Sequence, residues 1–242
     1  MKYYFLTLFP GLIHQYFGDS MMKRAVDSGV VDYEVIDIRD YSGNKHKKVD
    51  DYPYGGGAGM VMAAPPIAAA LKSIEGGAHY PVIHLSPGGR TFTQQEGEAL
   101  SEAEGLIFIC GHYEGIDERA YTLADEVISL GDYVLTSGEL ASMVVIDAVV
   151  RKLPGVLGAE TGALGESFAD GLLEYPQYTR PANFNGMEVP AVLLSGNHGV
   201  VDRWRREQSL ERTYRLRPDL LEGMELPDVD RAFLQSLSTD GR

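Results

Sequence analysis

The sequence is poor in features on which several classes of protein depend. Among its 242 residues only Cys110 is a cysteine, which excludes an intramolecular disulfide and any metal site built from several cysteines. No uninterrupted apolar segment is long enough to cross a bilayer, and the N-terminal MKYYFLTLFPG lacks the small-residue cleavage site of a signal peptide. These absences predict a cytoplasmic protein with no membrane partner.

Basic residues are also scarce. The chain has 21 Lys and Arg against 35 Asp and Glu, a formal net charge of −14, which argues against non-specific affinity for nucleic acid. The basic residues are nevertheless clustered, at 45–48 and in an arginine-rich run comprising Arg203, Arg205, Arg206, Arg212, Arg215 and Arg217. Because salt screens distant charges, a local cluster can still bind phosphates, although the run can equally be a solvated helix face.

The common nucleotide and metal motifs are missing. The stretch YGGGAGM (54–60) has neither the glycine spacing nor the preceding strand of a dinucleotide fingerprint, and the chain contains no P-loop, HExxH, GxSxG or EF-hand sequence. The histidines are scattered, so His84 and His112 are interpreted as packed side chains. The sequence therefore predicts no metal ligand set and disfavours a nicotinamide dehydrogenase.

What the sequence does contain is an alternation of strand and helix patterns in a globular composition with 44% hydrophobic residues. Such alternation indicates right-handed crossovers and a mainly parallel α/β sheet with helices on both faces. Thr93 and Glu96 are spaced as a capping box for one of the helices. Strands are expected at 1–9, 33–38, 80–86, 106–110 and 127–130, and helices at 12–28, 65–74, 93–101, 115–124 and 138–152.

The pattern changes after Pro154, where glycines recur as far as residue 168. Residues 170–192 are rich in loops, and helix patterns follow at 197–214, 218–221 and 228–237. We therefore expect a first domain at 1–157, a flexible linker at 158–168 and a small helical domain at 169–242.

The first domain is organised around residues 128–139, ISLGDYVLTSGE, which read as a strand end, a glycine loop and a helix start. Taken alone, this is an ordinary strand-to-helix turn. Three strands end in the same way, however, in LSPGG (85–89), ICGHYEG (109–115) and SLGDYVLTSG (129–138). Since ligands of open α/β sheets bind beyond the carboxyl ends of the strands, these loops predict one cleft built largely from main chain.

Eight stretches, in order and over nearly the whole chain, resemble the bacterial tRNA (guanine-N1)-methyltransferases of the SPOUT class. They are YGGGAGM (54–60), LSPGGR (85–90), CGHYEGIDER (110–119), GDYVLTSGE (131–139), DAVVRKLPGVLG (147–158), ESFADGLLEYPQYTRP (166–181), VLLSGNH (192–198) and WRREQSLERT (204–213). The resemblance implies a trefoil knot at the C-terminal side of the first domain, a homodimer with shared active sites, and S-adenosylmethionine as the cofactor. It also suggests dependence on Mg²⁺.

The resemblance assigns residues of all three loops to the cofactor. Two positions depart from the family pattern: Gly88 stands where glutamine is common, and Ser137 where a second glycine is common. The effect of Ser137 on the cofactor is left open. The implied cofactor-binding residues are Leu85, Ser86, Pro87, Gly89, Tyr113, Glu114, Gly115, Leu130, Gly131, Tyr133, Leu135 and Gly138.

The resemblance also assigns the chemistry. Methylation of guanine N1 removes the N1 proton and spreads negative charge onto O6, so a general base and an oriented cation are needed. By match, Arg151 is the cation and Glu166 the base, although the family has aspartate at the latter position; Asp170 is the alternative base. The second domain is expected to bind the anticodon branch of tRNA, with position 37 as target, through Ser195, Asn197, His198, Arg203, Arg205 and Arg206.

Two further interpretations stay open. The chain can be a methyltransferase of the same class with another RNA target. It can also be a non-catalytic RNA-binding or anticodon-sensing protein of the same fold, an alternative prompted by Glu166 and Ser137.

Overall fold

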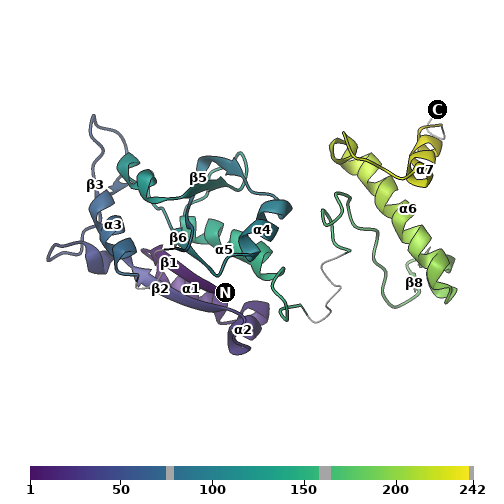
Figure 1. Cartoon of the computed structure of the whole chain (residues 1–242), viewed down its shortest axis with the longest axis horizontal. Helices are drawn as coiled ribbons and strands as arrows, with labels where there is room; N and C mark the ends of the chain where they lie inside the picture. The colour runs from purple at the N-terminus through teal and green to yellow at the C-terminus, as the bar shows by residue number, and fades with distance from the viewer. Residues whose placement is uncertain (75–78, 158–164, 240–242) are drawn as a thin grey trace. The chain divides into compact units, whose positions relative to one another are not determined.

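The computed structural model describes residues 1–74, 79–157 and 165–239. These residues form two compact units, Met1–Glu160 and Thr161–Arg242, which are described separately (Figure 1). The boundary falls inside the predicted linker 158–168, of which 158–164 lie outside the described residues. The roles expected of the two domains stay predictions at this point.

The first unit is built on a five-stranded sheet in the order β2-β1-β6-β5-β7, and every neighbouring pair is parallel. The predicted parallel α/β sheet is confirmed. Parallel strands are joined by helices rather than tight turns, as the strand and helix alternation indicated. The strands are β1 (Lys2–Thr7), β2 (Asp32–Asp37), β5 (Val82–Thr91), β6 (Gly105–Ile109) and β7 (Glu126–Ser129).

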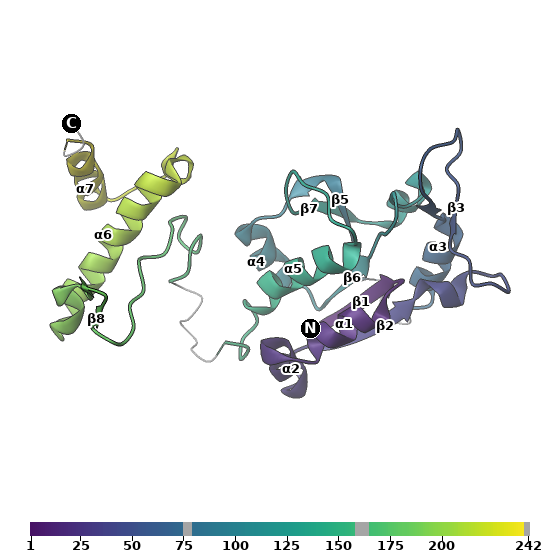
Figure 2. The same ribbon diagram turned by 180° about the vertical axis from the view of Figure 1, so that it is seen from behind.

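Helices cover both faces of this sheet (Figures 1 and 2). Alternate side chains of a strand point to opposite faces, so Tyr3 and Phe5 join one buried cluster while Tyr4 and Leu6 join another. The first cluster packs against α1 (Pro10–Phe17), α2 (Ser20–Asp27), α4 (Gln94–Ser101) and α5 (Gly138–Val150). The second packs against α3 (Ala64–Lys72) and the short 3₁₀ helices η1 (Ile38–Tyr41) and η2 (Glu118–Leu123).

Three expectations about the helices of this unit meet different outcomes. The helix expected at 12–28 is two helices, because Gly18 ends α1 and the Asp19 side chain caps α2 by accepting a hydrogen bond from the Ser20 N–H. The helix expected at 115–124 is only the 3₁₀ turn η2, with Asp117 as its cap. The cap at Thr93 is confirmed, since its hydroxyl accepts from the Glu96 N–H.

Strand pairing also occurs in two places outside the expected strands. Strand β5 does not stop at residue 86: Leu85 and Arg90 both pair with Ile128, so residues 86–89 bulge out and the strand resumes. Between η1 and α3 the chain contains β3 (Asp50–Asp51), which pairs antiparallel with β4 (Val61–Met62).

The second unit is mainly helical, as expected. It contains α6 (His198–Leu216), α7 (Asp228–Thr239), the 3₁₀ helices η3 (Ala191–Leu194) and η4 (Pro218–Leu221), and the hairpin β8 (Asn183–Phe184) and β9 (Met187–Glu188). Leu172, Leu210 and Thr213 form its buried centre. Across the described part of the chain, no helix combines the length and apolarity that crossing a membrane requires.

Candidate functional site

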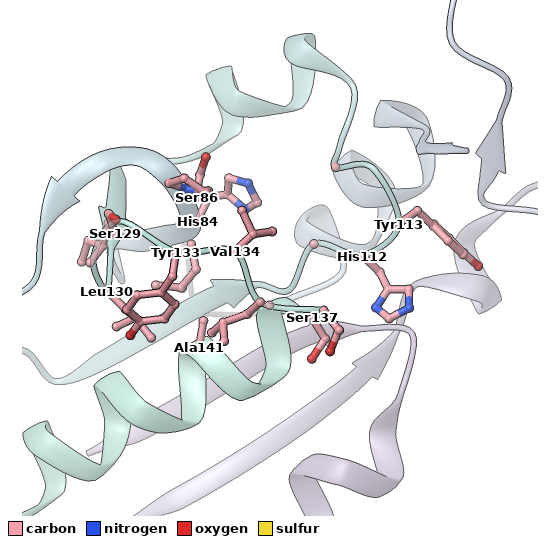
Figure 3. A pocket seen from close by; sticks show the side chains of 18 of the residues that line it. His84, Ser86, His112, Tyr113, Ser129, Leu130, Tyr133, Val134, Ser137 and Ala141 are labelled. Carbon is pink, nitrogen blue, oxygen red and sulfur yellow. The ribbon is translucent and has the colours of Figure 1, made fainter. Parts of the chain in front are cut away.

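The bulged part of β5 and the loops that follow β6 and β7 meet around one cavity of about 380 Å³ at the carboxyl edge of the sheet. Figure 3 shows its lining, in which the stretch from Leu130 through Tyr133 and Val134 to Ser137 runs from the end of β7 to the start of α5. This is the cleft that the three glycine-bearing strand ends predicted.

Two glycines let backbone lie directly on backbone at the edge of this cavity. The Gly138 N–H donates a 2.7 Å hydrogen bond to the Gly111 carbonyl oxygen, and a Cβ on Gly138 would lie 2.5 Å from the Gly111 nitrogen. A Cβ on Gly89 would lie 2.6 Å from the backbone nitrogen of Ile128. A side chain at Gly138 would therefore push the start of α5 away from the end of β6, and one at Gly89 would push β5 away from β7.

Two other glycines are required by backbone conformation. Gly115 has φ +128° and Gly131 has φ +146°, a region that residues with a Cβ rarely adopt. Space is not the constraint at Gly115, where an added Cβ meets no atom within 4 Å. In contrast, Gly88 has an ordinary φ, and an added Cβ would contact only the Ser86 hydroxyl at 3.9 Å.

The structure brings together all the predicted cofactor residues except Gly89. Gly89 is not among the lining residues; it allows the close contact between the backbones of β5 and β7. Ser137, the departure from the family pattern, also lines the cavity. The predicted residues that do so are Leu85, Ser86, Pro87, Tyr113, Glu114, Gly115, Leu130, Gly131, Tyr133, Leu135 and Gly138.

Sequence reasoning missed His84 as a lining residue. Its side chain is only 3% exposed, and Nδ1 lies 3.1 Å from the Ile109 carbonyl oxygen. Its ring also meets Tyr121 edge-on at 4.8 Å, and the Tyr121 hydroxyl lies 3.2 Å from Ser86 Oγ. Burial lowers the pKa of His84, so the imidazole is neutral near pH 7. The interpretation as a packed residue is confirmed, but the side chain also lines the cavity.

The glycine-rich stretch 54–60 packs against the β6 loop. The Glu114 N–H donates to the Met60 carbonyl oxygen at 3.1 Å, and the Met62 N–H donates to the Gly115 carbonyl oxygen at 2.9 Å. A Cβ on Gly59 would lie 2.5 Å from Glu114 Cγ. Gly59 thus leaves room for the Glu114 side chain beside the cavity, a role that the sequence did not reveal.

A buried polar cluster lies under the start of α5. The Thr7 hydroxyl donates a 2.5 Å hydrogen bond to Glu139 Oε1 and accepts one from the Phe9 N–H. Ser142 Oγ donates to the Glu139 carbonyl oxygen and lies 3.6 Å from Cys110 Sγ. Burial raises the pKa of the Cys110 thiol, which excludes it as a thiolate nucleophile at neutral pH.

The two predicted catalytic residues lie in different units. Arg151 follows the last residue of α5 in the first unit, and Glu166 begins a turn in the second. Asp170, the alternative base, lies in that turn, and its carboxylate accepts a 2.5 Å hydrogen bond from Arg206. Among the described residues, no group of three or more His, Cys, Asp or Glu is placed to hold a metal ion.

The residues predicted to bind tRNA lie at the start and middle of α6. Asn197 caps the helix by accepting from the Val200 N–H, His198 is its first residue, and Ser195 donates to the Val192 carbonyl oxygen. The arginines differ in their surroundings. Arg203 is 70% exposed; Arg205 stacks on Tyr175 at 5.0 Å and contacts Asp202; Arg206 binds both Asp170 and Asp230.

Fold and site together define an α/β protein with a small-ligand cleft made mostly of main chain. A sequence model of one family, described as tRNA (guanine-1)-methyltransferase TrmD, matches residues 1–223. Two tRNA (guanine-N(1)-)-methyltransferases are similar over almost their whole length: that of Halalkalibacterium halodurans is 54% identical over 98% of both chains, and that of Moorella thermoacetica is 55% identical over 96% of this chain and 95% of its own. The chain belongs to the tRNA (guanine-1)-methyltransferase family.

Glycine substitutions at the cleft test this site. We expect Gly115→Val and Gly131→Val each to abolish measurable S-adenosylmethionine binding in calorimetry, because valine does not adopt the φ values of these positions. Gly88→Ala is the matched control in a neighbouring loop and should bind like the wild type, since its Cβ meets no close atom. Near-native affinity in both valine variants would show that the cofactor does not bind in this cavity.

Proposed function

We propose that the protein transfers a methyl group from S-adenosylmethionine to N1 of the guanosine at tRNA position 37, next to the anticodon. Membership of the family over residues 1–223 carries the proposal. The cavity supports it because its volume falls in the range of small-ligand pockets, roughly 300–1,000 Å³, and its walls combine apolar side chains with main-chain groups.

The cleft residues suit an adenosine-containing ligand. Leu130, Leu135 and Ala141 offer an apolar surface for the adenine ring, and the backbone of the β6 and β7 loops offers hydrogen-bonding groups at its edge. In the family the loops belong to a trefoil knot, and the same knot is proposed here. The bound cofactor supplies an electrophilic methyl group on a sulfonium, which leaves as a neutral thioether.

Glu166 and Arg151 are proposed to handle the proton and the charge. The Glu166 carboxylate accepts the N1 proton of guanine while N1 bonds to the methyl carbon. The Arg151 guanidinium stabilises the negative charge that develops on O6, an interaction worth on the order of 3 kcal/mol for one well-placed donor. Glutamate keeps the carboxylate of the family's aspartate and adds one methylene.

The second unit is proposed to bind the anticodon branch of tRNA. Backbone N–H groups at a helix start are suited to phosphate, and Ser195, Asn197 and His198 lie at the start of α6. Arg203 and Arg205 extend this surface along the helix. The expected cytoplasmic location follows from the substrate. Dependence on Mg²⁺ stays a prediction from the family, and no step described here involves a metal.

A homodimer is proposed from an exposed apolar surface on α1 and α5, two helices joined by the 3.0 Å hydrogen bond from Tyr16 to Asp147. Leu12 is 43% exposed, and Leu140 and Val144, one turn apart on α5, are each 46% exposed. We expect sedimentation equilibrium at micromolar concentration to give a dimer, and Leu140→Glu with Val144→Glu to give a monomer. A monomeric wild type would contradict the proposal.

The activity itself is tested by incubating the protein with total tRNA and radiolabelled methyl donor, followed by nucleoside analysis. We expect label in 1-methylguanosine, and its loss when guanosine 37 is replaced in a transcript. The non-catalytic alternative predicts cofactor binding without turnover. Label in another nucleoside would instead indicate a different RNA target.

The base is tested by single-turnover methylation. Glu166→Gln removes the basic carboxylate at nearly constant size, so the rate should fall roughly 10²-fold or more, with binding of tRNA and cofactor intact. Glu166→Asp restores the family's residue and should retain most activity. If Asp170→Asn is inactive while Glu166→Gln reacts normally, Asp170 takes the role of base.

A further inference from the structure

The proposed base begins a turn with its own internal hydrogen bonds. The Ala169 N–H donates to the Glu166 carbonyl oxygen at 3.1 Å, and the Phe168 N–H donates to the Leu172 carbonyl oxygen at 2.7 Å. Phe168 has φ +73°, an uncommon conformation for a residue with a side chain. Residues 166–172, here called the base turn, are therefore locally ordered.

The base turn is packed against the helices of its own unit. Leu172 is 1% exposed, and the next residue, Leu173, donates its N–H to Thr213 Oγ1 of α6 at 2.9 Å. Gly171 lies so close to Met224 that an added Cβ would be 2.6 Å from the Met224 Cε. Figures 1 and 2 show the chain after the grey trace running beside α6.

Arg206 joins this turn to both helices. From α6, its Nη1 donates to Asp170 Oδ2 in the base turn at 2.5 Å, while Nε and Nη2 donate to Asp230 Oδ2 in α7 at 3.0 and 2.9 Å. Asp170 is itself fixed, since its Oδ1 accepts from the Leu172 N–H at 3.3 Å. Burial alone would lower the pKa of Arg206, but its bonds to Asp230 and Asp170 raise it, so the guanidinium stays charged.

We propose that Arg206 is a positioning residue for the methyl transfer: it clamps the base turn to α6 and α7, so that Glu166 moves with the tRNA-binding unit as one rigid piece. The inference rests on the proposed role of Glu166. It is carried by the position of the Arg206 guanidinium, which lies between the Asp170 carboxylate of the base turn and the Asp230 carboxylate of α7.

The same contacts argue against the expected role of Arg206 as a phosphate ligand. The Asp230 side chain is only 9% exposed, and Arg206 supplies both of its side-chain hydrogen bonds in the described structure. Turning Arg206 toward tRNA would leave this carboxylate buried and unpaired, which is strongly unfavourable. Arg203 has no such constraint, because its partner Glu207 is one helical turn away and partly exposed.

The clamp is tested with Arg206→Gln in the full-length protein, with Arg231→Gln as control. Arg231 pairs with Asp228 on the exposed side of α7 and does not contact the base turn. We expect Arg206→Gln to lower the single-turnover rate at saturating tRNA roughly 10- to 100-fold, as misplacement of a reacting group does. The pH–rate profile should keep its shape, because the base is still present. Arg231→Gln should behave like the wild type.

Amide hydrogen exchange measures the stability of the base turn independently of enzymatic activity. In Arg206→Gln the amides of Phe168, Leu172 and Leu173 should exchange at least roughly tenfold faster, with those around Leu210 unchanged, since local opening is independent of the helix core. This result is expected even if Glu166→Gln shows that Glu166 is not the base, so failure of the proposed function is distinguished from failure of the clamp. Unchanged exchange in the base turn would overturn the proposal.

The salt dependence of tRNA binding separates the two roles of arginine. Arg203→Gln should reduce the slope of log affinity against log salt by roughly 0.7–0.9, the value of one phosphate contact, whereas Arg206→Gln should leave it unchanged. Arg206→Lys keeps the charge and a single donor nitrogen with three N–H groups, so it should recover part of the rate. This variant also guards against a substitution that does not fold. If Arg206→Gln lowers the salt-dependence slope but keeps a normal single-turnover rate at saturating tRNA, Arg206 is a phosphate ligand and the clamp is contradicted.

Discussion

The cleft depends on backbone lying against backbone where neighbouring strands end. Gly138 rests on Cys110 and Gly111, and Gly89 rests on Val127 and Ile128, at separations that no side chain allows. The three loops are thereby drawn close enough to share one cavity. Main-chain hydrogen-bonding groups are then fixed by the sheet itself, so the uncharged adenosine part of the proposed cofactor can be held with few charged side chains.

The sequence predicted the sheet and the cleft because both rest on local signals. Apolar runs that end in glycine mark β6, β7 and the first part of β5, and the segment at the end of each run lines the cavity. The break between α1 and α2 was missed because the apolar spacing continues through it, while the decisive contact is a single cap at Asp19. His84 was missed because a buried histidine in a strand pattern looks the same whether or not a cavity lies beside it.

Long-range contacts set the remainder of the site, and no local pattern reports them. Gly59 faces Glu114 from a stretch more than fifty residues earlier in the chain, and Thr7 of β1 meets Glu139 of α5. Among the described residues, none forms a hydrogen bond with Oε2 of the buried Glu139 carboxylate. Its bond to Thr7 ties the first turn of α5, and so the adjoining Gly138 contact, to the end of the central strand β1.

The arginine-rich run shows why a count of charges is a poor guide to a nucleic-acid surface. Several of its members already face carboxylates: Arg203 faces Glu207, Arg205 faces Asp202, and Arg215 faces Glu211. Exposed pairs of this kind contribute about 0–1 kcal/mol, so a phosphate can replace the carboxylate at little cost. Arg206 differs because Asp230 is buried behind it. Burial of the partner, rather than the arginine itself, decides which of these cations can bind RNA.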